Sequence, residues 1–249
     1  MMKKILLVAT SMVALSGMAS VAAADHNYVG MGLGWTTAKM KHKGSANKPT
    51  VAAFTNSFSK TLSDSSAVSG TLSFGRTFDS GDVSWLAEGK FGLDSTNATE
   101  THGTTFPGAG AGLSDFRTNL KRKGTLGLSV GASKNFSPVS LYTKLSLLYS
   151  KFEYSHTETY LGATPALGGD TADMTSQKKF GLGIEVGATK PLTSDVSLGI
   201  GYIFERYQTV KHSMASFTTP GGAFNPRANY TARTKPTYHT VMATLTKTL

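Results

Sequence analysis

Bulky apolar residues alternate with small polar residues along most of the chain after about residue 25. Residues 29–35 read VGMGLGW, with large side chains at odd positions and glycine at even positions. A period of two places successive side chains on opposite faces of a strand. The same pattern recurs and predicts eight strands, within residues 29–35, 68–78, 83–93, 125–132, 139–150, 180–188, 196–205 and 240–249.

The connections between these strands alternate in length. Tight turns are predicted at residues 79–82, 137–138 and 191–195, where Gly, Pro, Ser and Asp supply suitable turn chemistry. Four longer polar stretches, near residues 40–60, 97–112, 155–176 and 208–230, are expected to be loops. Short turns at one end and long loops at the other are typical of an outer-membrane β-barrel.

The face opposite the bulky residues distinguishes a membrane barrel from a soluble β-sandwich. A sandwich would carry long charged side chains on its solvent face, whereas here that face is mostly Gly, Ser and Thr. Small residues suit the crowded interior of a narrow barrel. The longest apolar run after residue 25 covers only residues 51–54, far from the ~20 residues of a transmembrane helix. We therefore expect an all-β fold, an eight-stranded antiparallel transmembrane β-barrel.

The first 24 residues have the three parts of a cleavable signal peptide. Lys3 and Lys4 precede a mostly apolar stretch over residues 5–21, and small residues end at Ala24. We expect cleavage after Ala24, export to the bacterial outer membrane, and one barrel domain over residues 25–249. The sequence has no cysteine, which excludes disulfides, thiolate zinc sites and a cysteine nucleophile.

From about Asn27 to Leu249 the alternation and turn spacing resemble the small eight-stranded outer-membrane barrels of Gram-negative bacteria. The nearest groups are the OmpA-like transmembrane domain, the OmpX-like proteins and the opacity-type surface proteins. The resemblance implies folding by the outer-membrane assembly machinery, a lumen that is closed or only leaky, and, for the opacity type, adhesion. Members usually end in an aromatic residue, whereas this chain ends in Leu249.

Charged residues at inward positions predict an ion-pair network in the lumen, because an isolated buried charge is costly. We expect two lysines to bridge three glutamates, the set being Glu88, Lys90, Lys144, Glu185 and Glu205. A filled lumen argues against general porin activity and leaves a narrow solute channel as the alternative. Aromatic residues near the strand ends predict two girdles, formed by Phe78, Trp85 and Phe136 near the short turns and by Trp35, Tyr149, Tyr202 and Phe204 near the long loops.

The chain carries a formal net charge of +10, and its bases concentrate in the first and last long connections. They predict a basic extracellular rim from loops one and four: Lys39, Lys41, Lys43, Lys48, Lys60, Lys211, Arg227, Arg233 and Lys235. Lys121, Arg122 and Lys123 form a second basic cluster. Such a rim attracts anionic groups. The lipopolysaccharide phosphates of the outer leaflet are the favoured partners, and sulfated or sialylated host glycans or surface proteins are the alternative. Nucleic acid is not expected, because aromatics do not interleave with the bases.

Candidate catalytic groups are sparse. None of the six histidines is followed two residues later by serine, the arrangement that outer-membrane lipid A deacylases use. Outer-membrane proteases need paired acids and a histidine on ten strands, and only His156, Asp170 and Asp173 hint at that. With Glu158 they make a weak metal site, and a solvated acidic loop is favoured. We expect no catalytic residue, metal or cofactor, and a structural or adhesive surface role, with a lipid-modifying enzyme as the least favoured alternative.

Overall fold

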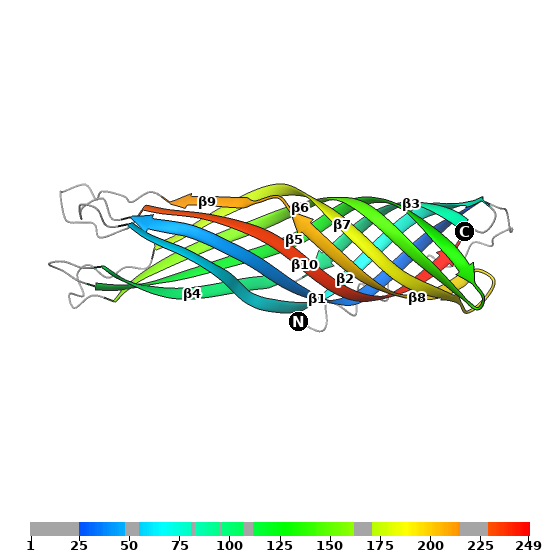
Figure 1. The fold of residues 1–249 in the computed structure, drawn as a ribbon, viewed down its shortest axis with the longest axis horizontal. Helices are drawn as coiled ribbons and strands as arrows, with labels where there is room; N and C mark the ends of the chain where they lie inside the picture. The colour runs from blue at the N-terminus through cyan, green and yellow to red at the C-terminus, as the bar shows by residue number, and fades with distance from the viewer. Residues whose placement is uncertain are drawn as a thin grey trace.

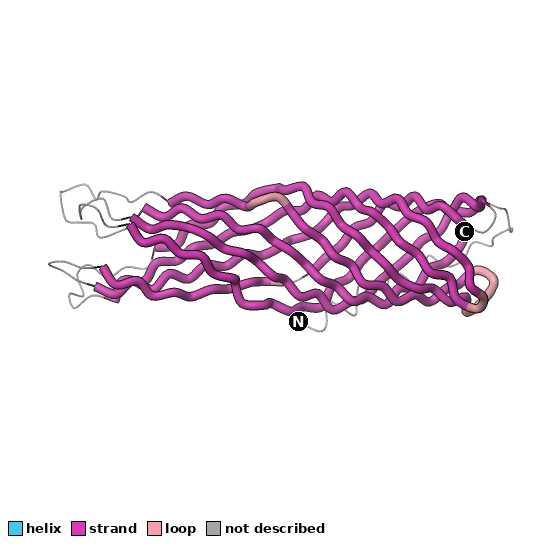
Figure 2. The backbone as a smooth tube through the Cα atoms, viewed as in Figure 1, coloured by secondary structure: helices cyan, strands magenta, loops and turns pink. Residues whose placement is uncertain are grey.

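The computed structural model describes residues 25–47, 55–80, 83–94, 96–106, 112–161, 171–214 and 229–249. They form one elongated β-barrel whose strands wind obliquely around its long axis (Figure 1). Nearly all of the described backbone is strand (Figure 2). No helix among these residues is long and apolar enough to cross a membrane.

The described residues form one antiparallel sheet that closes on itself. Its strands are β1 (Asp25–Asn47), β2 (Thr55–Ser80), β3 (Val83–Asp94), β4 (Asn97–Phe106), β5 (Gly112–Phe136), β6 (Val139–Leu161), β7 (Thr171–Pro191), β8 (Val196–Tyr207), β9 (Val210–Met214) and β10 (Asn229–Thr248). β3 and β4 both pair with β5, and β8 and β9 both pair with β10. Each of these two pairs forms one interrupted position in the ring, so the ring has eight positions, which we call staves. β1 pairs with β10 and closes it. The predicted eight-stranded barrel is confirmed.

The strands are much longer than the sequence suggested. β1 and β2 pair up to Asn47 and Thr55, and β6 and β7 pair up to Glu158 and Thr171. The expectation of loops is therefore wrong for most of residues 40–60, 97–112 and 155–176, and for residues 210–214 and 229–230 of the stretch 208–230. Only residues 48–54, 107–111, 162–170 and 215–228 of these connections lie outside the described residues. At the other end, β5–β6 and β7–β8 are joined by short connections at residues 137–138 and 192–195, as predicted.

The bulky side of the predicted strands faces outward. Leu128 is 70% exposed and Ile200 is 61% exposed, although either would lie in the centre of a sandwich. The inward residues are small because other inward side chains and backbone atoms already fill the lumen. A Cβ on Gly187 would lie 2.5 Å from the Ile200 carbonyl oxygen and 2.6 Å from the Tyr142 hydroxyl. Only glycine therefore fits at this inward position, because Tyr142 of the neighbouring stave lies across it.

The outward apolar residues occupy only part of the barrel's length. On β5 they run from Leu126 to Phe136. At ~3.3 Å per residue and a tilt of ~40°, this stretch spans about 25 Å, the height of the apolar band of a membrane barrel. Trp35, Val241 and Tyr202 form a cross-strand row at its upper edge. We call the part from this row to the short turns the membrane half, and the part from this row to the strand tips the projecting half.

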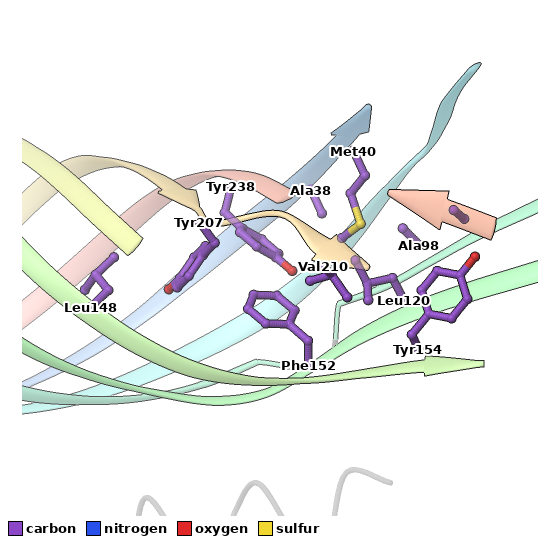
Figure 3. Close-up of a cluster of buried hydrophobic side chains, with 11 residues drawn as sticks. Ala38, Met40, Ala98, Leu120, Leu148, Phe152, Tyr154, Tyr207, Val210 and Tyr238 are labelled. Atoms are coloured by element: carbon purple, nitrogen blue, oxygen red, sulfur yellow. The ribbon is translucent and has the colours of Figure 1, made fainter. Parts of the chain in front are cut away.

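The projecting half has its own hydrophobic core inside the barrel. Phe152, Tyr207 and Tyr238 point toward one another from three staves (Figure 3). The core consists of Ala38, Met40, Ala98, Leu120, Leu148, Phe152, Tyr154, Tyr207, Val210, Ala232 and Tyr238. The outward side chains at the same level are polar, such as Lys39 and Lys41. This half is thus packed like a soluble barrel.

Candidate functional site: a closed lumen and two basic surfaces

A charged cluster fills the lumen of the membrane half. The Lys144 ammonium lies 2.9 Å from Glu88 and 3.7 Å from Glu185. The Tyr28 hydroxyl donates to Glu88 and the Tyr142 hydroxyl to Glu185, each at 3.0 Å. Each carboxylate therefore has both a cation and a phenol as partners, which offsets the cost of its burial.

A second charged cluster closes the lumen where the two halves meet. The Arg122 guanidinium forms ion pairs with Asp94 and Glu205 and donates to the Tyr207 hydroxyl at 3.1 Å. Its carbon Cζ lies 3.8 Å from the centre of the Tyr238 ring. The side chains of Asp94, Arg122 and Glu205 are nearly completely buried. Five groups from four staves thus cross the lumen at this level.

This second cluster differs from the predicted network. Lys144 does bridge Glu88 and Glu185, but Glu205 forms its ion pair with Arg122 and not with Lys90. Lys90 lines a small cavity of about 30 Å³ together with Arg122 and Glu205. The sequence predicts Arg122 in the second basic cluster with Lys121 and Lys123, and that prediction is wrong because Arg122 is buried in the lumen.

A β-bulge explains why Arg122 points inward. The pairing of β5 with β6 shifts by one residue between Arg122 and Gly124, so Lys123 is the extra residue. A one-residue shift exchanges the two faces of a strand. Counting in steps of two from Thr125 would place Lys123 inward, but the bulge turns Arg122 inward and leaves Lys123 exposed. Gly124 is the local sequence signal, because glycine inside a strand often marks a bulge.

The lumen also holds polar groups at both of its ends. Toward the short turns, a cavity of about 260 Å³ is lined mainly by Ser and Thr hydroxyls below Lys144. In the projecting half, His42, His156 and His212 are buried, with Nδ1 at 2.8 Å from Thr234, 3.1 Å from Thr118 and 3.3 Å from Thr175, respectively. The sequence placed His42 and His156 in loops, and the structure corrects this. No metal-binding group of three or more His, Cys, Asp or Glu occurs among the described residues.

The described residues of the predicted basic rim lie on strands and not on loops. Lys39, Lys41 and Lys43 are exposed on β1, Arg233 and Lys235 on β10, and Lys211 on β9. Lys48, Arg227 and the side chain of Lys60 lie outside the described residues. In the cross-strand register Lys41 is opposite Lys235, Lys43 is opposite Arg233, and Arg233 is opposite Lys211. We call Lys41, Lys43, Lys211, Arg233 and Lys235 the basic ladder.

A second basic surface lies on the outer wall of β5, β6 and β7. Lys151 is directly opposite Lys178, and Lys121 is directly opposite Glu153. We call Lys121, Lys123, Lys151 and Lys178 the lysine cluster. Glu153 lies 3.0 Å from Lys123 and 3.6 Å from Lys151. The hydrogen bond from Lys123, together with the charges of both lysines, lowers the pKa of the Glu153 carboxyl.

The predicted girdle residues face outward near the two edges of the apolar band. Phe78 is directly opposite Trp85 near the β2–β3 connection, and Phe136 lies at the β5–β6 turn. Near the upper edge, Tyr149 and Phe180 have ring centres 5.1 Å apart. The Tyr202 hydroxyl lies 2.6 Å from His239 Nδ1, beside Trp35 in the upper row, and Phe204 packs edge-on against the same histidine.

Comparison with known proteins agrees with this architecture. The family model described as outer membrane protein beta-barrel domain matches residues 5–219. The outer membrane protease OmpT of Escherichia coli superposes with a TM-score of 0.51 at 10% identity, over 94% of this chain and 100% of that chain. OprG of Pseudomonas aeruginosa gives a TM-score of 0.45 at 17% identity, over 89% and 95% of the two chains. Neisserial surface protein A gives 0.32 at 14% identity, over 88% and 98%. Comparison with curated proteins gives no match. The OmpT likeness shows the fold alone.

Proposed function

Because the chain belongs to the outer membrane protein beta-barrel domain family, we propose that it is a surface protein with a closed lumen whose projecting wall binds anionic glycans. In such barrels short turns face the periplasm and long connections face outward. The projecting half therefore stands outside the cell, and the basic ladder lies on its wall.

The observation that carries the proposal is the opposition of like charges on β1, β10 and β9. Directly opposed side chains have Cβ atoms about 4.5–5.5 Å apart, and like charges at that distance are destabilising. The ladder repeats this arrangement at three successive pairs, Lys41–Lys235, Lys43–Arg233 and Arg233–Lys211. A bound polyanion would relieve the repulsion. Arginine can also grip phosphate or sulfate with two hydrogen bonds.

Two sources of polyanion share this chemistry, sulfated glycans of a host and the phosphorylated sugars of lipopolysaccharide. Immobilised barrel in detergent should be tested against heparin, lipopolysaccharide and neutral dextran. We expect binding to the two anions that weakens with salt, and none to dextran. Preference for heparin would identify an adhesive role, and preference for lipopolysaccharide would identify anchoring in the cell's own envelope. Binding of neither would overturn the proposal.

A ladder variant tests the residues themselves. The triple variant Lys43→Gln, Lys211→Gln, Arg233→Gln removes two of the three opposed pairs, so it should fold at least as stably as the natural chain. Its affinity for heparin should fall about tenfold or more, since each exposed ion pair contributes ~0.2–1 kcal/mol. The matched control is Lys134→Gln with Lys190→Gln, exposed lysines near the short turns. Equal binding by both variants would contradict a role for the ladder.

The closed lumen has its own test. Side chains from several staves cross it at Lys144, at Arg122 and in the hydrophobic core of the projecting half. In planar bilayers we expect no stable steps on the nanosiemens scale. Such steps from the natural chain would favour the narrow-channel alternative.

A further inference from the structure

The lysine cluster is an unfavourable arrangement for an unliganded surface. Lys151 on β6 is directly opposite Lys178 on β7, and directly opposed like charges are destabilising. Lys121 and Lys123 follow on β5, and Glu153 is the carboxylate that the structure places against Lys123 and Lys151. Four cations around one anion leave an excess positive charge at one spot on the wall. The cluster is therefore suited to an anionic group from outside the chain.

An apolar groove begins directly below these lysines. Two residues along β6 from Lys151 is Tyr149, and two residues along β7 from Lys178 is Phe180. The groove has a volume of about 730 Å³, and its apolar lining includes Leu72, Phe74, Phe91, Leu126, Leu128, Leu147, Tyr149 and Phe180. It therefore runs from the edge of the apolar band into the membrane half, across β2, β3, β5, β6 and β7.

Gly89 opens the floor of this groove. It lies between Phe74 and Leu128 in the cross-strand register, on the outward side of β3. A Cβ at this position would lie 3.9 Å from the Phe74 carbonyl oxygen, an ordinary van der Waals distance. Glycine here is not required by crowding, in contrast to the inward Gly187. Its effect is to leave room for something on the lipid side.

We propose that this wall binds a phosphorylated lipid of the outer leaflet, with one acyl chain in the groove and a phosphate on the lysine cluster. Each part matches one chemical feature of such a lipid. The groove supplies an apolar channel at membrane depth, Tyr149 and Phe180 mark the interface where aromatic side chains concentrate, and the lysines lie where headgroups begin. The inference rests on the outer-membrane location of the family, and it is independent of glycan binding by the ladder.

Native mass spectrometry of the detergent-solubilised barrel tests the site directly. The probes are bisphosphorylated lipid A and the same lipid after enzymatic dephosphorylation. We expect one tightly bound lipid A, with the dephosphorylated form bound about tenfold more weakly, because it loses two or more exposed ion pairs. Equal binding of the two forms, or a mass that shows a second copy of the chain in place of lipid, would overturn the proposal.

Three variants separate the two parts of the site. Lys151→Gln with Lys178→Gln should weaken lipid A about tenfold and leave the dephosphorylated lipid unaffected. Gly89→Leu should fill the groove and weaken both forms. Glu153→Gln removes the competing carboxylate and should strengthen lipid A binding severalfold, a gain that misfolding cannot produce. Unchanged lipid A binding in the double lysine variant or in Gly89→Leu would refute the assigned site.

The two proposals can fail separately. The double lysine variant removes an opposed pair of cations, so it should fold, as a heat-dependent shift on gels would verify. Its heparin binding should equal that of the natural chain, because the ladder lies on β1, β9 and β10. The ladder variant should in turn keep its bound lipid. If heparin binding depended on Lys151 and Lys178 instead, the lipid assignment would be wrong.

Discussion

The membrane half and the projecting half of this barrel use the same strands with opposite chemistry. On β6, Leu145 and Leu147 face outward in the membrane half, with Ser146 between them facing inward. Farther along the same strand the outward residue is Lys151 and the inward residue is Phe152. The period of two and the sidedness stay constant along the strand. What changes is the medium outside, so the apolar side of each strand follows lipid in one half and the protein interior in the other.

The largest expected effect comes from breaking the charged cluster where the halves meet. Arg122→Met leaves Asp94 and Glu205 buried without their cation, which should reduce the free energy of unfolding by roughly 3–5 kcal/mol. Urea unfolding in lipid vesicles measures it. Arg206→Met, an exposed base on β8, is the matched control and should stay within ~0.5 kcal/mol. If both variants were equally stable, the buried cluster would have no structural role.

The difference between the two outer surfaces, apolar in the membrane half and polar in the projecting half, can be tested by introducing an outward arginine in each half. Val130→Arg puts a cation against lipid near mid-membrane and should cost about 2–4 kcal/mol. Ser176→Arg puts it on the exposed wall of the projecting half, opposite Glu153, and should be close to neutral. The two unfolding free energies in vesicles give the comparison. A neutral Val130→Arg would mean that this wall does not face lipid.

Alanine substitutions at two glycines with different surroundings test how tightly the inner face is packed. Gly187→Ala forces a Cβ against the Ile200 carbonyl oxygen and the Tyr142 hydroxyl, and overpacking of this kind costs about 1–3 kcal/mol. Gly70→Ala should cost less, because a Cβ there would lie 3.9 Å from both the Gly32 carbonyl oxygen and the Leu33 side chain. Thermal unfolding in detergent would rank them, and the reverse ranking would contradict the packing described for the lumen.

The smallest expected effect concerns the outer wall of the projecting half and depends on pH. The pKa of Glu153 is lowered in the folded chain, chiefly by its hydrogen bond from Lys123. The stabilisation is therefore fully present above the unfolded pKa of ~4.3 and is lost as the pH falls through the lower folded value. Because the pair is partly exposed, it should be worth at most ~1 kcal/mol. Glu153→Gln should differ in stability from the natural chain at pH 7 but not at pH 2, and less in high salt. A difference that persists at pH 2 would assign it to another cause.

The sequence predicted the membrane half well because one rule governs it. Large residues such as Leu128 and Ile200 alternate with glycine and serine, and lipid outside makes that alternation conspicuous. The projecting half follows the same period, since residues 38–43 read AKMKHK. From sequence alone this stretch resembles a loop, because lysine occupies the outward positions that apolar lipid-facing residues occupy in the membrane half. The alternation with a period of two is present in both halves, but in the projecting half the polar residues face outward and the apolar residues face inward.

The candidate site was less accessible from sequence. The bridging of Glu88 and Glu185 by Lys144 follows from counting in steps of two along regular strands. The position of Arg122 does not, because the bulge at Lys123 exchanges the faces of β5, and a bulge is fixed by pairing with a neighbouring strand. The ladder and the lysine cluster depend on register between distant segments. Sequence supplied the bases, but which base is opposite which is a property of the closed ring.

The continuity of β1 and β10 beyond the apolar band determines how far the molecule reaches. From Val241 to Asn229, β10 continues for about a dozen residues, which at ~3.3 Å each and a tilt of ~40° raises its tip about 30 Å above the lipid edge. A flexible tether of equal contour would sample all heights. A hydrogen-bonded barrel with a packed interior instead holds its strand tips, and any group bound there, at one fixed height above the lipid edge.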